Sequence, residues 1–347
     1  MSSLLVFVCL NIIIWKLYVD KVNSRGEYVV GDLASMSYYM DLTLPRKNIL
    51  DLKKKHISFS EFNNTKVDML VVGDSYSNGG GNGRNNYYQD YIATYNDLKV
   101  LNILQLPETN NFIETVILLA NSGYLKKLDV KYVFIQSVQR EALERFATDI
   151  NYDLNSSEDI YKMITSVYDI YNPKDEDKQE IEIMNNLNQN ALLYNVKFML
   201  KGYGKFKGYY IEKINKELFS SKISDEVIFF TDDIKKLKYE NDENIMEIND
   251  NFNKLAKFLR EQDIELLVMI NADKYNVYSQ YISSHKYPKS TFFEILRKLP
   301  KRYQFIDTKE ILLKELEKGV KDLYYPDDTH WSYKASEAVF KNIKLNE

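Results

Sequence analysis

The chain has 347 residues, of which 46 are Lys or Arg and 50 are Asp or Glu, giving a net charge of −4 at pH 7. This near balance argues against nucleic acid as a partner, because proteins that bind it usually carry a strongly basic face. Hydrophobic residues make up 45% and charged residues 28% of the chain, which is ordinary for a folded protein of one large domain, with or without an insertion. Because Cys9 is the single cysteine, a disulfide within the chain is excluded.

An apolar run opens the chain. Residues 4–19 read LLVFVCLNIIIWKLYV, and only Asn11 and Lys16 interrupt the run. It is apolar on every side, which favours a membrane helix over a buried core helix, although it is shorter than the ~20 residues that cross a bilayer comfortably. Neither a basic start nor a small-residue cleavage site accompanies it, so we expect an uncleaved anchor over residues 1–20.

The rest of the chain predicts an α/β domain over residues 67–347, preceded by a polar connector, residues 21–66, that packs on it. Short apolar runs predict strands at residues 67–72, 99–104, 131–135, 264–270 and 303–306. Helical spacing predicts helices at about 111–125, 248–262, 290–299, 309–318 and 333–343. Strands that alternate with helices predict a three-layer fold, in which helices flank both faces of a parallel sheet.

A long tract, about residues 148–244, separates the third and fourth predicted strands. It is rich in Asp, Glu, Asn, Lys and Tyr and has only weak helical periodicity. A crossover between parallel strands needs far fewer residues. We therefore expect a mostly helical insertion, which would serve as a lid or as a surface for a partner.

A serine motif follows the first predicted strand directly. Residues 73–77 read GDSYS, and glycines follow at positions 79–81 and 83. Reactive groups of parallel sheets lie beyond the carboxyl ends of the strands, so Ser75 is the candidate nucleophile. Gly79 and Gly80 are candidates for letting backbone N–H groups approach a developing oxyanion. Gly, Asp and Ser are also ordinary turn residues. The motif indicates a nucleophile mainly because it lies at the end of the first predicted strand.

The candidate base is one of only three histidines. His330 lies in the sequence DDTHW, residues 327–331, just before the last predicted helix. A serine hydroxyl needs a base, and that base needs a carboxylate, which Asp327 or Asp328 can supply from the same loop. Either aspartate could instead cap the helix. His56 and His285 lie in polar stretches and are predicted to be surface residues, and we expect no metal and no cofactor.

The two motifs resemble the first and last blocks of the SGNH, or GDSL-like, hydrolase family, in the same order along the chain. The resemblance implies a flavodoxin-like fold and a Ser-His-Asp triad. The Asp-x-x-His spacing of that family selects Asp327, which we favour, and leaves Asp328 to cap the last helix. The D-x-H-W form resembles alginate acetylation proteins and related polysaccharide O-acetyltransferases, and it selects Asp328. The serine-first order is closer to peptidoglycan O-acetyltransferases of the same fold.

Other segments resemble the family less closely. Residues 270–278, INADKYNVY, are similar to a strand-end segment of the alginate-type family, with Asn271 in place of a proline and with no chemical role assigned to Lys274. The glycine and Asn blocks that complete the oxyanion hole in the family have no clear counterpart in this sequence. Asn110 and Gln139 are the candidate amide donors, and Arg140 is a candidate for binding an anionic or carbonyl group. Packing at a helix start is the other interpretation of Gln139 and Arg140.

A triad of this kind supports acyl transfer through an acyl-serine. The resemblance implies O-acetylation of a cell-surface or secreted polysaccharide, with a multi-span membrane O-acyltransferase as the acyl donor. The anchor would then hold the catalytic domain outside the cytoplasm. A carbohydrate acetyl esterase of the same fold is the first alternative, and a noncatalytic polymer-binding surface protein is the second.

Overall fold

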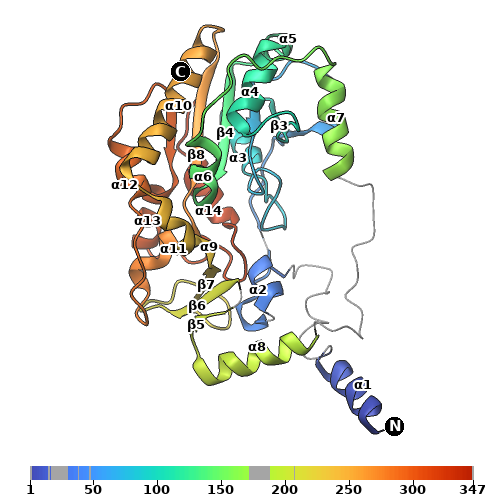
Figure 1. The fold of residues 1–347 in the computed structure, drawn as a ribbon, viewed down its shortest axis with the longest axis vertical. Helices are drawn as coiled ribbons and strands as arrows, with labels where there is room; N and C mark the ends of the chain where they lie inside the picture. The colour runs from blue at the N-terminus through green and yellow to red at the C-terminus, as the bar shows by residue number, and fades with distance from the viewer. Residues whose placement is uncertain are drawn as a thin grey trace.

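A parallel sheet forms the centre of the molecule (Figure 1). The computed structural model describes residues 2–14, 16, 30–37, 39–46, 48–171, 188–206 and 208–345. Within them the sheet has six strands in the order β1-β3-β2-β4-β8-β9, and every neighbouring pair is parallel. The strands are β1 (Ile57–Ser58), β2 (Met69–Val72), β3 (Val100–Ile103), β4 (Tyr132–Val138), β8 (Glu265–Asn271) and β9 (Gln304–Asp307). Without the short edge strand β1, this is the strand order of flavodoxin-like folds.

The predicted parallel α/β architecture is therefore confirmed, and each of the five predicted strands is present with ends that differ by a few residues. Residues of β2 and β3 are buried at every position. Helices cover both faces of a sheet joined by parallel crossovers, and this is why the strands read as continuous apolar runs rather than as alternating patterns.

Two groups of helices cover the sheet. Helices α4 (Phe112–Asn121), α6 (Gln139–Phe146) and α10 (Asp242–Arg260) contact one another and strands β4 and β8. A second group contacts β3 and β8 and consists of α3 (Tyr88–Asn96), α13 (Thr308–Glu317) and α14 (Tyr333–Phe340). The remaining helices of this domain are α5 (Tyr124–Lys127), α11 (Lys274–Tyr278) and α12 (Phe292–Lys298). The helix predicted over residues 111–125 is in fact α4 and α5, because Gly123 between them has a φ of 71°, which a right-handed helix does not accommodate.

The tract predicted as a mostly helical insertion contains a second sheet. It begins with α7 (Ile160–Tyr171) and α8 (Asn188–Lys201) and ends with α9 (Asp232–Lys235). Between α8 and α9 lie three antiparallel strands, β5 (Gly204–Lys205), β6 (Tyr209–Lys213) and β7 (Glu226–Phe230). The prediction missed these strands, because β6 and β7 are buried on both faces and so lack the alternation that marks a half-exposed strand.

The first helix, α1 (Ser2–Ile14), has 13 residues. In the part of the chain that the structure describes, no helix is both long enough and apolar enough to cross a membrane. Residues 1, 15 and 17–20 of the predicted anchor lie outside that part.

Residues 30–46 of the predicted connector pack on the domain through α2 (Asp32–Ser37) and the 3₁₀ turn Met40–Leu42. Leu33 and Leu42 are fully buried against the small sheet, beside Ile211 and Ile228. The backbone N–H of Ala34 donates to the Asp327 carbonyl at 3.0 Å. The connector therefore joins the small sheet to the loop that carries His330.

Candidate active site

The turn that carries Ser75 begins where β2 ends and leaves no room for a side chain at its first residue. A Cβ at Gly73 would lie 2.1 Å from Ser77 Oγ and 2.5 Å from Gln136 Oε1, closer than such contacts are found. Within the turn, the Ser77 N–H donates to the Asp74 carbonyl at 2.9 Å. The Gly80 N–H donates to the Ser75 carbonyl at 2.8 Å. The chain thus reverses sharply, and Ser75 is exposed beyond the carboxyl edge of the sheet.

Asp74 fixes this turn to the neighbouring strand. Its Oδ2 accepts from the Val138 N–H at 2.8 Å and from Arg145 Nη1 at 2.6 Å. Its Oδ1 accepts from Gln136 Nε2 at 2.9 Å. The sequence analysis assigned no role to Gln136, which directly follows the predicted third strand, residues 131–135, and lies within β4 in the structure. These bonds give Asp74 a positioning role. They leave the Ser75 hydroxyl available to bond His330.

Ser75, His330 and Asp328 form one chain of hydrogen bonds. His330 Nε2 lies 2.8 Å from Ser75 Oγ, and His330 Nδ1 lies 2.6 Å from Asp328 Oδ1. A carboxylate only accepts, so Nδ1 carries the proton and the neutral ring leaves Nε2 free to accept from the serine. Burial increases along the chain: Ser75 is exposed, whereas the side chains of His330 and Asp328 are 12% and 3% exposed.

Asp327, which the sequence analysis favoured as the partner of His330, instead pairs with residues from the connector. Its Oδ1 accepts from Arg46 Nη1 at 2.8 Å, and its Oδ2 accepts from the Gly31 N–H at 2.9 Å. It is Asp328 that contacts the imidazole, and the same Oδ1 atom also accepts from the His330 N–H at 2.9 Å. The tight turn explains the reversal, because the carboxylate two residues before the histidine already faces its ring. The geometry therefore fits the D-x-H-W pattern.

The two aspartates differ in their acid strength. Burial works to raise the pKa of Asp328, but the hydrogen bond and charge of His330, together with the Arg46 charge, hold the pKa below its ordinary value. For Asp327, burial outweighs Arg46 and raises the pKa. Burial alone would lower the pKa of His330, but the hydrogen bond and charge of Asp328 raise it above its ordinary value. Asp328 thus stabilises the charged imidazolium, as the partner of a base should.

The imidazole is packed on two sides by residues of the serine turn. The Tyr76 ring lies 4.8 Å from the His330 ring, and the Tyr76 hydroxyl donates to the Thr329 carbonyl at 2.8 Å. A Cβ at Gly80 would lie 2.3 Å from both Cδ2 and Nε2 of His330. Gly80 is therefore required for close packing against the base, rather than for a free N–H group.

Arg46 links the connector to both halves of the site, and no local sequence pattern pointed to it. Its Nε donates to the Gly81 carbonyl at 2.8 Å, and its Nη2 lies 3.5 Å from Asp328 Oδ2, in addition to its bond to Asp327. Its guanidinium also lies 3.9 Å from the centre of the Tyr325 ring. The side chain is only 2% exposed, so its charge depends on these partners.

Lys274 holds the His330 loop from the opposite side. Its ammonium donates to the carbonyls of Tyr325, Pro326 and Asp328 at 2.8, 2.9 and 3.0 Å. The side chain is buried, and burial lowers its pKa to about 8. Three donors on one nitrogen match three carbonyls of a tight turn. This explains a lysine at the end of β8 without a chemical step.

The amide candidates chosen from the sequence are engaged elsewhere. Asn110 Nδ2 donates to Glu114 at 2.9 Å, at the start of α4. Gln139 Nε2 donates to both Glu240 and Ser290, at 3.0 and 2.7 Å, so neither amide hydrogen is left for an oxyanion. Arg140 Nη1 bridges two buried carboxylates, Asp233 at 3.4 Å and Asp273 at 3.0 Å. Packing at the helix start is therefore the better interpretation of Gln139 and Arg140.

Two other donors lie on the serine turn itself. Among the residues that the structure describes, the backbone N–H of Ser75 has no acceptor. Asn78 is exposed, and its Oδ1 accepts from Asn102 Nδ2 at 3.1 Å, which leaves its own amide hydrogens free. Gly79, the other glycine candidate, has a φ of 80°, and its carbonyl accepts from Asn86 Nδ2 at 2.7 Å.

Asp32 brings a third acidic group to the base. It accepts hydrogen bonds from the N–H and the hydroxyl of Thr329, and its Oδ2 lies 4.0 Å from His330 Nδ1. Ligand atoms of Asp32, Asp328 and His330 lie within 4.8 Å of one another, as metal ligands also can. However, Nδ1 faces Asp328 at hydrogen-bonding distance, so we interpret this group as a histidine with its supporting carboxylates.

The other two histidines pair with acids away from Ser75. His285 is exposed, as predicted, and its Nδ1 lies 2.9 Å from Glu212. The prediction of a surface position is wrong for His56, whose side chain is only 11% exposed and whose Nδ1 lies 2.7 Å from Asp90. Asp90 is a buried residue of α3, and the hydrogen bond of His56 to its carboxylate brings the imidazole close to that helix.

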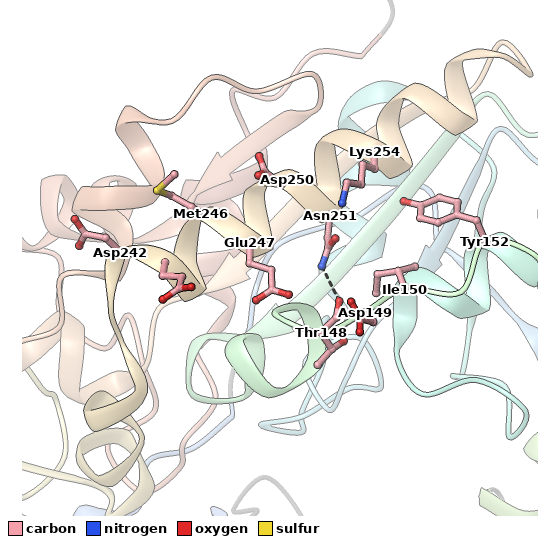
Figure 2. Close-up of a pocket in the computed structure, with 11 residues that line it drawn as sticks. Thr148, Asp149, Ile150, Tyr152, Asp242, Met246, Glu247, Asp250, Asn251 and Lys254 are labelled. Atoms are coloured by element: carbon pink, nitrogen blue, oxygen red, sulfur yellow. Dashed lines mark hydrogen bonds between the residues drawn. The ribbon is translucent and has the colours of Figure 1, made fainter.

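A large cleft lies apart from these residues, between α10 and residues 148–152 (Figure 2). Its volume is about 1090 Å³, and carboxylates such as Asp242, Glu247 and Asp250 dominate its lining. Asn251 closes its floor by donating to the Thr148 carbonyl at 2.9 Å. Size alone therefore does not select the candidate active site, for which the hydrogen bonds between Ser75, His330 and Asp328 are the stronger evidence.

A serine after β2 and a histidine before the last helix, on a parallel sheet of this order, are the features of an SGNH-like α/β fold. Residues 225–344 match the family model of the SGNH hydrolase-like domain of the acetyltransferase AlgX. The match confirms the resemblance to the SGNH family and to alginate acetylation proteins, and it supports an acetyltransferase or esterase type of function. It includes His330, Asp328 and Lys274, whereas Ser75 and Arg46 lie outside it. No curated protein sequence matches the chain.

Substitution of the two aspartates should separate their roles. With the pKa of His330 raised above its usual ~6.5, kcat/KM for an acetyl ester should rise with pH along a limb centred above that value. Asp328→Asn removes the raising charge, so the residual activity should be about 10⁴-fold lower, with its limb at lower pH.

Asp327→Asn is the matched control, because it leaves the contact of His330 with Asp328 in place. Its acidic limb should stay where it is in the wild type, while its melting temperature falls. An inactive Asp327→Asn protein with a shifted limb, beside an active Asp328→Asn protein, would make Asp327 the partner of the base.

Gly80→Ala should displace the imidazole without unfolding the protein. The added methyl group would meet the His330 ring at 2.3 Å, so the ring must move away from Ser75. Misplacing a reacting group by about 1 Å can cost about 10²-fold in rate. Ester turnover and thermal melting should be measured together, and wild-type turnover at an unchanged melting temperature would contradict the packing described here.

Arg46→Lys should destabilise the protein, because one ammonium does not replace a guanidinium that reaches Gly81, Asp327 and Asp328 together. Loss of one partner of a buried ion pair typically costs about 3–5 kcal/mol in the free energy of unfolding, which denaturant titration would measure. Lys66→Met, which breaks an exposed pair with Asp129, should leave that free energy unchanged. Equal effects of the two variants would refute the linking role of Arg46.

Proposed function

We propose that this protein is an O-acetyltransferase that modifies an extracellular or cell-surface polysaccharide through an acetyl-Ser75 intermediate. The single observation that carries the proposal is the chain of hydrogen bonds from Ser75 through His330 to Asp328. The match of residues 225–344 to a domain of an acetyltransferase supports transfer.

The first half of the reaction loads the serine. His330 Nε2 takes the proton of Ser75 Oγ as that oxygen attacks the acetyl carbonyl, and Asp328 stabilises the imidazolium that forms. The Ser75 N–H and the Asn78 amide are the donors for the oxyanion, because both lie on the serine turn without an acceptor among the described residues. The bond between the acetyl carbon and the leaving group of the donor then breaks, and the imidazolium gives its proton to that leaving group.

The second half discharges the serine. A sugar hydroxyl loses its proton to His330 Nε2 as its oxygen attacks the acetyl-serine carbonyl. The bond from Ser75 Oγ to the carbonyl carbon breaks, and Oγ regains the proton from the imidazolium. A multi-span membrane O-acyltransferase is the proposed donor, with the domain outside the cytoplasm and residues 1–20 as its anchor. The apolar sequence of α1, which contains no charged residue, supports the membrane anchor.

One observation favours hydrolysis as the second candidate function. Ser75 is exposed, so water can reach an acetyl group bound to it. Water in place of the sugar hydroxyl in the second half of the reaction would make the protein a carbohydrate acetyl esterase.

Ser75→Ala should abolish both outcomes, because Ser77, the other serine of the turn, is buried and its hydroxyl is bonded to Tyr88 and Gln136. Turnover of an acetyl ester by the full chain should fall by about 10⁴- to 10⁶-fold. Ser60→Ala, at an exposed serine that bonds only to Ser58, should retain wild-type turnover. With an oligosaccharide acceptor present, mass spectrometry should detect the acetylated sugar. Free acetate alone would favour the esterase, and an active Ser75→Ala protein would exclude the acyl-serine mechanism.

A further inference from the structure

Helix α8 exposes apolar side chains on the face that points away from the domain. On its inner face, the Phe198 ring lies 4.2 Å from the Tyr39 ring and contacts the buried cluster of α2 and the small sheet. On its outer face, the exposed fractions are large: 52% for Leu193, 42% for Val196, 82% for Met199 and 81% for Leu200. A helix that is apolar on its outer face as well as its inner face is not explained by packing within the domain.

This outer face continues onto a second apolar helix. Helix α1 contacts α8, and the two lie together at the bottom of Figure 1, away from the central sheet. The exposed large apolar side chains of α1 are Leu5, Val6, Phe7, Leu10, Ile12 and Ile13. Monomeric soluble proteins rarely expose contiguous apolar surfaces of this kind, so the surface requires a covering partner.

The charges of the two helices identify what that partner is. Neither α1 nor α8 contains an acidic residue, and Lys197 and Lys201 are exposed on α8 beside its apolar positions. Lys16 and Lys205 are also exposed close to the two helices along the chain. Two copies of this surface placed together would oppose like charges. An anionic lipid surface would instead accept both the apolar side chains and the lysines.

We propose that α8 lies flat in the headgroup region of an anionic membrane, beside α1, as a second membrane contact. This binding is independent of acetyl transfer. It also has a structural consequence, since α8 leads directly into β5 of the small sheet, on which α2 packs. Asp32 of α2 in turn contacts Thr329, beside the base. A flat α8 would therefore set the orientation of the Ser75 turn relative to the membrane, which α1 alone does not do.

The test places a polarity-sensitive fluorophore on α8 in the full chain. In a Cys9→Ala background, Met199→Cys and Met246→Cys give matched positions, because both are exposed methionines on helices and Met246 lies on α10, away from α1 and α8. With vesicles containing phosphatidylglycerol, the probe at position 199 should shift to the blue and be quenched by lipid-attached quenchers. The probe at position 246 should remain in water.

Two results obtained with vesicles would overturn the proposal. One is a probe at position 199 that stays in water while the protein sediments with the vesicles, because α1 alone would then make the contact. The other is equal quenching on neutral phosphatidylcholine vesicles. Lys197→Gln together with Lys201→Gln should weaken binding to anionic vesicles by about tenfold or more. A blue shift without lipid that grows with protein concentration would assign this surface to self-association instead.

Discussion

The buried pairing of Arg46 with Asp327 is the interaction on which the site depends. Arg46 comes from the connector, Asp327 comes from the loop of the base, and the guanidinium also reaches the Gly81 carbonyl of the serine turn. Three segments that are distant in sequence are thus fixed by one planar group. Burial of an ion pair is costly unless its remaining donors find partners, and Arg46 finds carbonyls for two of them. Specific geometry, more than net stability, is what such a group provides.

The loop that carries His330 is held from several directions. The Lys274 ammonium donates to carbonyls of the turn before His330. Arg46 and the Gly31 N–H donate to Asp327. Asp32 accepts from the Thr329 N–H. Every one of these contacts fixes a neighbour of His330, while Asp328 Oδ1 lies 2.6 Å from its Nδ1. The Nε2 atom is thereby aimed at Ser75 Oγ before any substrate arrives. Such preorganisation reduces the rearrangement that acyl transfer would need.

Two adjacent aspartates acquire opposite properties because their surroundings differ. Asp328 faces an imidazole whose charge stabilises the carboxylate, and its pKa falls. Asp327 is as deeply buried, but its hydrogen bonds to Arg46 and Gly31 do not fully offset its desolvation, and its pKa rises. Of these two adjacent residues, Asp328 therefore supports the base, whereas Asp327 joins the loop of the base to the connector. Spacing by itself carries no information about this difference.

Much of the fold could be predicted from the sequence because it follows from local composition. The strands of the main sheet are short apolar runs, and α10 repeats apolar residues at helical spacing, so their existence and order could be predicted without tertiary information. The small sheet could not, since β6 and β7 are buried on both faces and lack alternation. The helix over 111–125 was similarly too long, because a single Gly123 was not recognised as a break.

Ser75 and His330 could be chosen from sequence because each lies beside an element boundary that composition marks. The choice between Asp327 and Asp328 depended on the tight turn before His330, which directs the nearer carboxylate at the ring. The partners Arg46, Gly31 and Gln136 depended on contacts between segments far apart in the chain, and nothing local distinguishes them. The sequence by itself determined the parallel α/β fold and the candidate nucleophile and base. Only the tertiary structure decided which aspartate, arginine and lysine support them, because those contacts exist only once the connector has packed on the sheet.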